Sequence, residues 1–291
     1  MISIRSCAVV LVTVLPGAAV QPGTVVCQES PAPDSGPITL RLGGATGRVL
    51  SYAHVNRLSL GLPDELGGRA TTRTSLRLDQ KIESRGRDSV VVFSELREFQ
   101  FDVDPRPEEL PDLSRLEGLR FRFMATPAGR IYRIEIEGAG GPVQKQFREQ
   151  VETWLRGLGF PALPPGPARI GDSWTDSARV PLAALLGLQA EAEAIEVRTT
   201  TLADVDLEQG APIAQLDVET RWTDDPESTA RQLTVHGASS QTVRFDVRQG
   251  VFVDSRGTSR IRVEINAGKG EPPLAIEAEG SYETRLLEPD L

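Results

Sequence analysis

Segment after segment of this chain alternates apolar and polar residues with a period of two, and this pattern limits the fold more than any other feature. Leu76, Leu78 and Ile82 alternate with polar or charged neighbours, and the same pattern returns around Phe121 and Ile134. Successive side chains of a strand point to opposite faces, so each segment has one buried and one solvated face. Such segments are typical of antiparallel sheets, because parallel sheets are buried on both faces.

Short turns separate the alternating segments. Residues 126–129 read Thr-Pro-Ala-Gly, in which proline presets one backbone dihedral and glycine accepts a positive one. We therefore expect a hairpin between residues 119–125 and 130–137. Glycine turns at residues 85–87 and 248–250 are expected to join further strand pairs.

One segment has a helical period instead. Pro142 suits the first position of a helix, and Gly157 and Gly159 mark its end, so we predict a helix over residues 142–158. Because an amphipathic helix needs an apolar partner, we expect it on the inner face of the sheet. Its apolar stripe, whose members are candidate core or ligand-cavity residues, contains Val143, Phe147, Val151, Trp154, Leu155 and Leu158.

The predicted fold is mainly β, with one major helix. A large antiparallel sheet of about ten strands curls strongly, so we expect a half-barrel with the helix packed on its concave face. Two similar lobes are the alternative, because residues 119–123 and 243–247 alternate alike and each lead to a glycine turn. Around residues 190–195 the apolar positions slip by one, which predicts a β-bulge.

The N-terminus resembles an export signal. Arg5 precedes a short apolar run that ends in Pro16-Gly-Ala-Ala19, a small-residue cleavage site. We therefore expect an exported protein of the periplasm or cell envelope that begins at or after Val20. The predicted parts are a signal peptide (1–19), a disordered Pro-rich linker (20–37), a first β block (38–160), a Pro-rich connector (161–169) and a second β block (170–291).

Cys27 stands alone once the signal peptide has been removed, so a disulfide within one chain is not expected. Two interpretations remain open. The cysteine can be incidental, or it can be the lipidated residue of a lipoprotein that is followed by a polar tether in residues 28–37. Val26 argues against lipidation, because small residues normally occupy that position.

Composition excludes several classes of protein. The net charge is −9, and nucleic-acid binding normally requires a basic face. Once Cys7 leaves with the signal peptide, one Cys and two His remain, which is too few for a Cys/His zinc site, and we predict no metal and no cofactor. Each histidine, His54 and His236, is interpreted as a surface or hydrogen-bonded residue.

The second block opens with Gly171-Asp172-Ser173-Trp174. The motif lacks the complete Gly-x-Ser-x-Gly pattern of a nucleophile elbow, so we interpret it as a turn followed by a strand in which Trp174 points inward to the core or a ligand cavity. The motif and its surroundings resemble exported bacterial β-rich families of unknown function. The architecture also resembles that of the LolA/LolB-like periplasmic lipoprotein carriers, and this resemblance implies a concave apolar surface that holds acyl chains.

Three functions are compatible with these sequence features. The most specific is a non-catalytic binder or carrier of an apolar ligand, such as a lipid or an acyl chain. The second is a structural or protein-interaction module of the cell envelope. The third is a hydrolase, for which no catalytic residue is predicted.

Replacing Trp154 tests the predicted helix. Trp154→Ala removes a large side chain from the apolar stripe and should lower the free energy of unfolding by about 3–5 kcal/mol. Arg148→Ala, on the opposite face, should change it by less than about 0.5 kcal/mol. Denaturant melts measure both variants, and equally small effects would show that the helix does not dock.

Overall fold

The computed structural model describes residues 36–61, 68–105, 116–137, 160–181, 193–224, 233–265 and 273–287. These residues form one antiparallel sheet and contain no α-helix. The strands are β1 (Val49–Gly61), β2 (Arg69–Arg85), β3 (Val90–Asp104), β4 (Arg120–Ala125), β5 (Ile131–Glu137), β6 (Ser173–Pro181), β7 (Glu193–Glu208), β8 (Ala211–Asp224), β9 (Leu233–Asp246), β10 (Val251–Ile265) and β11 (Leu274–Leu287).

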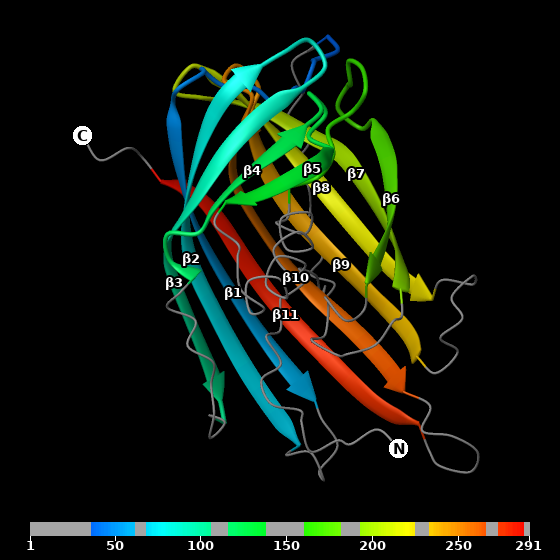
Figure 1. Ribbon diagram of the computed structural model, residues 1–291. Helices are drawn as coiled ribbons and strands as arrows, with labels where there is room; N and C mark the ends of the chain where they lie inside the picture. Colours follow the sequence, from blue (N-terminus) through cyan, green and yellow to red (C-terminus); the bar gives the residue numbers. More distant parts are fainter. Residues whose placement is uncertain are drawn as a thin grey trace.

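The strand order is β5-β4-β3-β2-β1-β11-β10-β9-β8-β7-β6. Consecutive strands lie side by side except β5 and β6, which form the two edges of the sheet. At the centre β1 pairs with β11 over a register from Ser51↔Leu287 to Gly61↔Glu277. This pairing joins the first and second halves of the chain into a single sheet. Figure 1 shows that the sheet curves strongly and that its edge strands β5 and β6 come round to the front.

The two edges are not paired with each other, so the sheet is unclosed. At the upper end of Figure 1 they are bridged instead: Arg130, in the β4–β5 turn, forms an ion pair of 2.9 Å with Asp176 of β6. Two connecting segments complete the bridge, because Leu42 N donates to Pro127 O and Leu163 N donates to Ala128 O.

The connecting segments that contain Leu42 and Leu163 also contribute to the core, which lies at the upper end of the sheet. Leu40 and Leu163 are fully buried against apolar residues of β7 to β10. Phe160 stacks on Phe252 with ring centroids 4.2 Å apart and meets Tyr52 edge-on. Burial of such large side chains is the main stabilising contribution that a sheet face can make.

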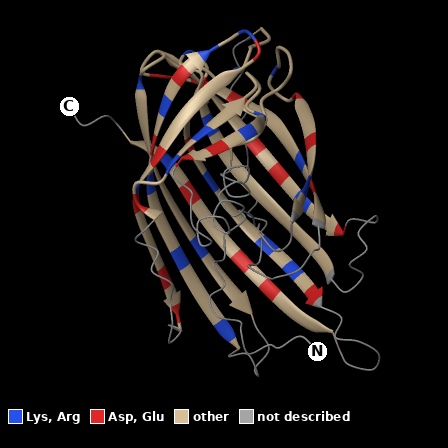
Figure 2. Cartoon of the chain, in the orientation of Figure 1, with Lys and Arg blue, Asp and Glu red and all other residues tan. Residues whose placement is uncertain are grey.

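Charged residues are spread along the strands (Figure 2), where most of them occupy exposed or half-buried positions of the alternation. Many pair across neighbouring strands, as Arg244 does with Asp254 and Arg262 with Glu277. Exposed ion pairs contribute little stability each. Their position nevertheless shows which face of the sheet is solvated.

The structure confirms the mainly β, antiparallel prediction and the hairpin turns at residues 85–87, 126–129 and 248–250. The alternative of two lobes is wrong for the described strands, because the β1–β11 pairing makes them one sheet. The bulge in β7 lies between Leu202 and Asp204, where the register shifts, and the pairing is regular from Glu193 to Leu202. The predicted helix over residues 142–158 lies outside the described residues.

Two leucines test the upper core. Leu216 of β8 has 0% of its surface exposed and Leu207 near the end of β7 has 78%. Leu216→Ala should lower the free energy of unfolding by about 2–5 kcal/mol, because it leaves a cavity among close-packed side chains. The chemically identical Leu207→Ala should change it by less than about 0.5 kcal/mol. If urea melts give similar free energies of unfolding for the two variants, this assignment of the core is wrong.

Candidate functional site

The inner face of the curved sheet is layered. Residues in register on neighbouring strands point to the same side, so the register defines rows that cross the sheet. One row crosses from Asn56 to Tyr282, Gly257 and Gln241, and the next crosses from Thr72 through Leu58, Gly280 and Ser259 to Arg198. These two rows are mostly polar.

We call the polar residues of these rows and their immediate neighbours the polar belt: His54, Asn56, Thr72, Arg198, Thr200, Thr220, Ser239, Gln241, Ser255, Ser259, Tyr282 and Thr284. All except Arg198 are buried. The upper core lies on one side of the belt. On the other side are buried apolar residues that we call the lower apolar rows: Leu60, Ala194, Trp222, Val235, Ile261, Val263, Ile276 and Ala278.

Four atoms of the polar belt have no hydrogen-bond partner among the described residues. They are Asn56 Oδ1, Thr72 Oγ1, Ser255 Oγ and Tyr282 OH. All four side chains are more than nine-tenths buried. A buried polar atom without a partner costs about 1–3 kcal/mol, so such a group of atoms on one face indicates a place where a polar ligand atom or water binds.

His54 and Tyr282 are both uncharged at neutral pH. Burial lowers the pKa of His54 to about 4, and His54 Nδ1 lies 2.8 Å from the hydroxyl of Thr284. Burial raises the pKa of Tyr282 well above its usual value, and the positive charge of Arg198 partly opposes this shift. Arg198 lies on β7, four strands from β11 in the sheet order.

Glu196 is the carboxylate beside the polar belt, and its oxygens are satisfied. Arg198 Nη2 donates to Oε1 over 2.8 Å, and Trp222 Nε1 donates to Oε2 over 2.9 Å. A carboxylate held in this way fixes the positions of Arg198 and Trp222. His54, with its low pKa, is a weak base at neutral pH. The belt is therefore suited to hydrogen bonding more than to proton transfer.

Of the residues singled out from the sequence, Trp174 is described. It lies at the start of β6, packs against the upper core and donates from Nε1 to Ala162 O over 2.6 Å. Cys27 and the helix residues Phe147, Val151, Trp154 and Leu158 lie outside the described residues. His54 is hydrogen-bonded, as expected, and His236 is exposed.

The polar belt was not predicted from the sequence. A signal was present, because His54 and Asn56 occupy inward positions between Tyr52 and Leu58 in the alternation of β1. Recognising the belt would have required the register between β1 and β11, which pairs these residues with Thr284 and Tyr282.

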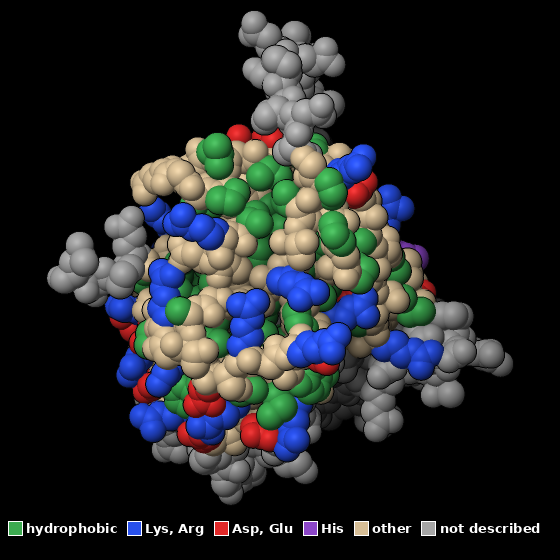
Figure 3. Space-filling model, turned by 90° about the horizontal axis from the view of Figure 1, so that it is seen from above, with side chains coloured by type: hydrophobic (Ala, Val, Ile, Leu, Met, Phe, Trp, Pro, Cys, Tyr) green, Lys and Arg blue, Asp and Glu red, His purple; other side chains and the backbone are tan. Residues whose placement is uncertain are grey.

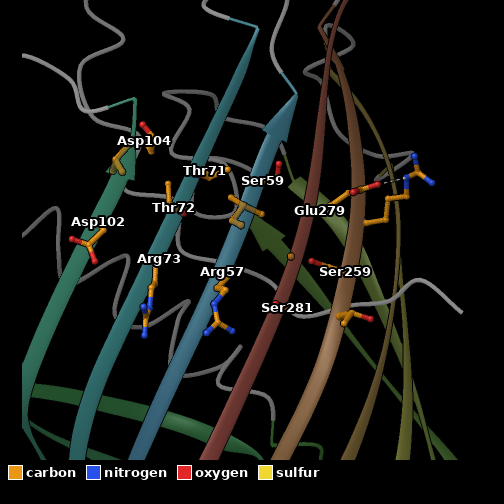
Figure 4. Close-up of a pocket in the computed structure, with 15 residues that line it drawn as sticks. Arg57, Ser59, Thr71, Thr72, Arg73, Asp102, Asp104, Ser259, Glu279 and Ser281 are labelled. Carbon is orange, nitrogen blue, oxygen red and sulfur yellow. Dashed lines mark ion pairs between the residues drawn. The ribbon is translucent and has the colours of Figure 1, made fainter.

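A hollow of about 580 Å³ lies over β3, β2, β1, β11 and β10 (Figure 4). Arg57 and Arg73 lie side by side there, and Asp102 follows on β3. At its other side Arg260 forms an ion pair of 3.4 Å with Glu279. Exposed charges of both signs are typical of a surface that faces solvent and not of a ligand site. We therefore place the candidate site on the inner face of the sheet, at the polar belt.

Within the described ranges, no helix is long and apolar enough to cross a bilayer. In the same part of the chain, no group of three or more His, Cys, Asp or Glu side chains is arranged to hold a metal ion.

No protein-family model and no curated protein matches the sequence. The chain matches several solved structures, among them the following three. The first, described as lipid-protein interactions in lipovitellin, is 11% identical with a TM-score of 0.47, and the match covers 85% of this chain but only 26% of that one. DynF from the dynemicin biosynthesis pathway of Micromonospora chersina is 11% identical, with coverage of 96% and 98% and a TM-score of 0.22. The translocator domain of autotransporter NalP from Neisseria meningitidis is 9% identical, with coverage of 83% and 88% and a TM-score of 0.20. These values identify no family.

The low pKa of His54 predicts a pH-dependent stability. In the unfolded chain His54 binds a proton near pH 6.5, whereas in the folded chain it binds a proton only near pH 4. The free energy of unfolding should therefore be highest above pH 6.5 and fall by about 3 kcal/mol on the way to pH 4 through this residue alone. Urea melts between pH 7 and pH 4 should show a shallower fall for His54→Gln.

The matched control is His236→Gln, which removes an exposed histidine from β9. It should keep the pH dependence of the unchanged protein. A His54→Gln variant with the same pH dependence as the unchanged protein would contradict a buried, neutral His54.

Proposed function

We propose that the protein binds an amphipathic molecule of the lipid class inside the curve of its sheet and holds it without chemical change. The observation that carries this proposal is the set of four unpartnered atoms in the polar belt, on Asn56, Thr72, Ser255 and Tyr282. Their side chains lie between the upper core and the lower apolar rows. A ligand with one polar group and an apolar chain would complement both features.

The hydrogen-bonding capacity of these atoms limits which polar groups the ligand can carry. Asn56 Oδ1 only accepts, whereas the hydroxyls of Thr72, Ser255 and Tyr282 both donate and accept. Arg198 already has a counter-charge in Glu196. A neutral group that both donates and accepts, such as the diol of a monoacylglycerol, satisfies this set. A fatty-acid carboxylate only accepts and leaves Asn56 unsatisfied.

The apolar chain of the ligand fits the lower apolar rows. Ile261, Val263 and Val235 are buried there, next to Leu60 and Trp222. Burial of apolar surface contributes about 25 cal/mol per Å², so contact along these rows supplies affinity while the polar belt supplies orientation.

Removal of one unpartnered hydroxyl tests the proposal. Tyr282→Phe should raise the free energy of unfolding of the empty protein by about 1 kcal/mol, because a buried polar atom without a partner is removed. The same change should weaken binding of monoolein about 3- to 10-fold, because it removes one hydrogen bond to the ligand. Urea melts and a fluorescence displacement titration measure the two effects.

Tyr132→Phe is the matched control, because Tyr132 lies on β5 and is 53% exposed. This variant should change neither the free energy of unfolding nor the affinity for monoolein. Monoolein should also bind more tightly than oleate. If monoolein does not bind, or binds equally to Tyr282→Phe and the unchanged protein, the proposed site is wrong.

A further inference from the structure

The upper end of the sheet is basic, although the chain as a whole has a net charge of −9. The turns and connecting segments at this end carry seven exposed arginines and four exposed carboxylates. The arginines are Arg41, Arg48, Arg85, Arg87, Arg130, Arg169 and Arg248, and the carboxylates are Asp88, Asp172, Asp206 and Glu208. Figure 3 looks down on this end and shows basic side chains gathered across it.

Contacts between the segments bring several of these arginines together. Gly43 N donates to Gly250 O over 2.8 Å, which joins the segment of Arg41 to the β9–β10 turn of Arg248. Arg48 Nη1 donates to Gln249 in the same turn. The guanidinium of Arg85 lies beside Gly43. Arginines from three separate segments therefore share one surface.

Two of the four carboxylates are already satisfied. Asp172 Oδ2 accepts from the backbone N–H of Arg169 over 2.8 Å, and Glu208 pairs with Arg244 of β9. Among the arginines of this end, Arg130 has a carboxylate partner in the described part of the chain, namely Asp176. The other arginines keep their charge available to a partner.

Exposed apolar side chains lie among these arginines. Four of the five most exposed large apolar residues in the described part of the chain belong to this end: Val49, Tyr132, Ile170 and Leu207. They come from different turns or strand ends, and green side chains lie between the blue ones in Figure 3. Isolated apolar tips surrounded by cations are suited to the interface of a bilayer, where apolar side chains enter and cations meet anionic headgroups.

We propose that the upper end docks on a membrane surface that contains anionic lipids. A nucleic acid would match the arginines but not the exposed leucine, valine and isoleucine. An acidic protein would need a contiguous complementary patch, whereas these apolar tips are spread over several turns. This docking surface lies at one end of the sheet and is separate from the polar belt, so it does not depend on the proposed ligand.

Vesicle binding of the full chain tests the docking surface. Every sample carries Cys27→Ser, so that no acyl group contributes to binding. Vesicles of phosphatidylcholine and phosphatidylglycerol (7:3) should bind the protein at least ten times more strongly than vesicles of phosphatidylcholine alone. Raising the salt concentration from 0.1 M to 0.5 M should remove most of the binding, because charges at a surface are screened.

A triple variant, Arg41→Gln/Arg85→Gln/Arg248→Gln, should lose at least ten-fold in binding to the anionic vesicles. The matched control, Arg57→Gln/Arg73→Gln/Arg221→Gln, removes the same charge from the outer wall and should stay within two-fold of the unchanged protein. Leu207→Ala should weaken binding about 3-fold, because an exposed apolar tip is shortened.

Three results would overturn the proposal: equal binding to both kinds of vesicle, equal losses in the two triple variants, or binding to heparin or DNA without binding to anionic vesicles. Urea melts of the same variants show whether they are folded, and a separate monoolein titration shows whether the inner site is intact. Failure of the docking surface and failure of the inner site are therefore distinguished.

Discussion

The pairing of β1 with β11 is the interaction on which the rest of the structure depends. It joins residues more than 200 positions apart along the chain and stands at the centre of the strand order. Without it, the described strands would form two smaller sheets, each with an additional open edge. The same pairing places His54 beside Thr284 and Asn56 beside Tyr282. The centre of the polar belt therefore exists because the first and last strands meet.

Local features of the fold could be predicted from the sequence. Alternation placed the strands around Leu76, Phe121 and Ile134, and the glycine turns placed the hairpins, because both signals arise from neighbouring residues. The slip near residues 190–195 corresponds to no bulge in the described residues 193–195, since parity alone does not show which strand is the partner. Residues 190–192 lie outside the described residues. The polar belt needed the β1–β11 register, which no local pattern encodes. Trp174 could be placed because its inward position follows from the turn just before it.

The unpartnered polar atoms of the belt lower the stability of the protein, and the fold does not require polar residues at these positions. Apolar residues in place of Asn56, Ser255 and Tyr282 would also fit the alternation of the strands, and they would make the inner face continuously apolar. Instead, each contributes an unpartnered polar atom. Sites where a sequence departs from the rules of its own fold are commonly functional. By contrast, both oxygens of Glu196 beside the belt are satisfied. Outside the belt, Ser94 Oγ and Arg77 Nε are also buried without a partner among the described residues.

The geometry around Tyr282 links the curvature of the sheet to the size of the site. A Cβ atom at Gly257, the register partner on β10, would lie 2.6 Å from the ring of Tyr282 and 2.7 Å from its hydroxyl oxygen. The absence of a side chain at Gly257 therefore lets the tyrosine lie across the neighbouring strand. Arg198 influences the same hydroxyl from β7, on the opposite side of the curve. A flatter sheet with the same residues would carry Arg198 away from this hydroxyl.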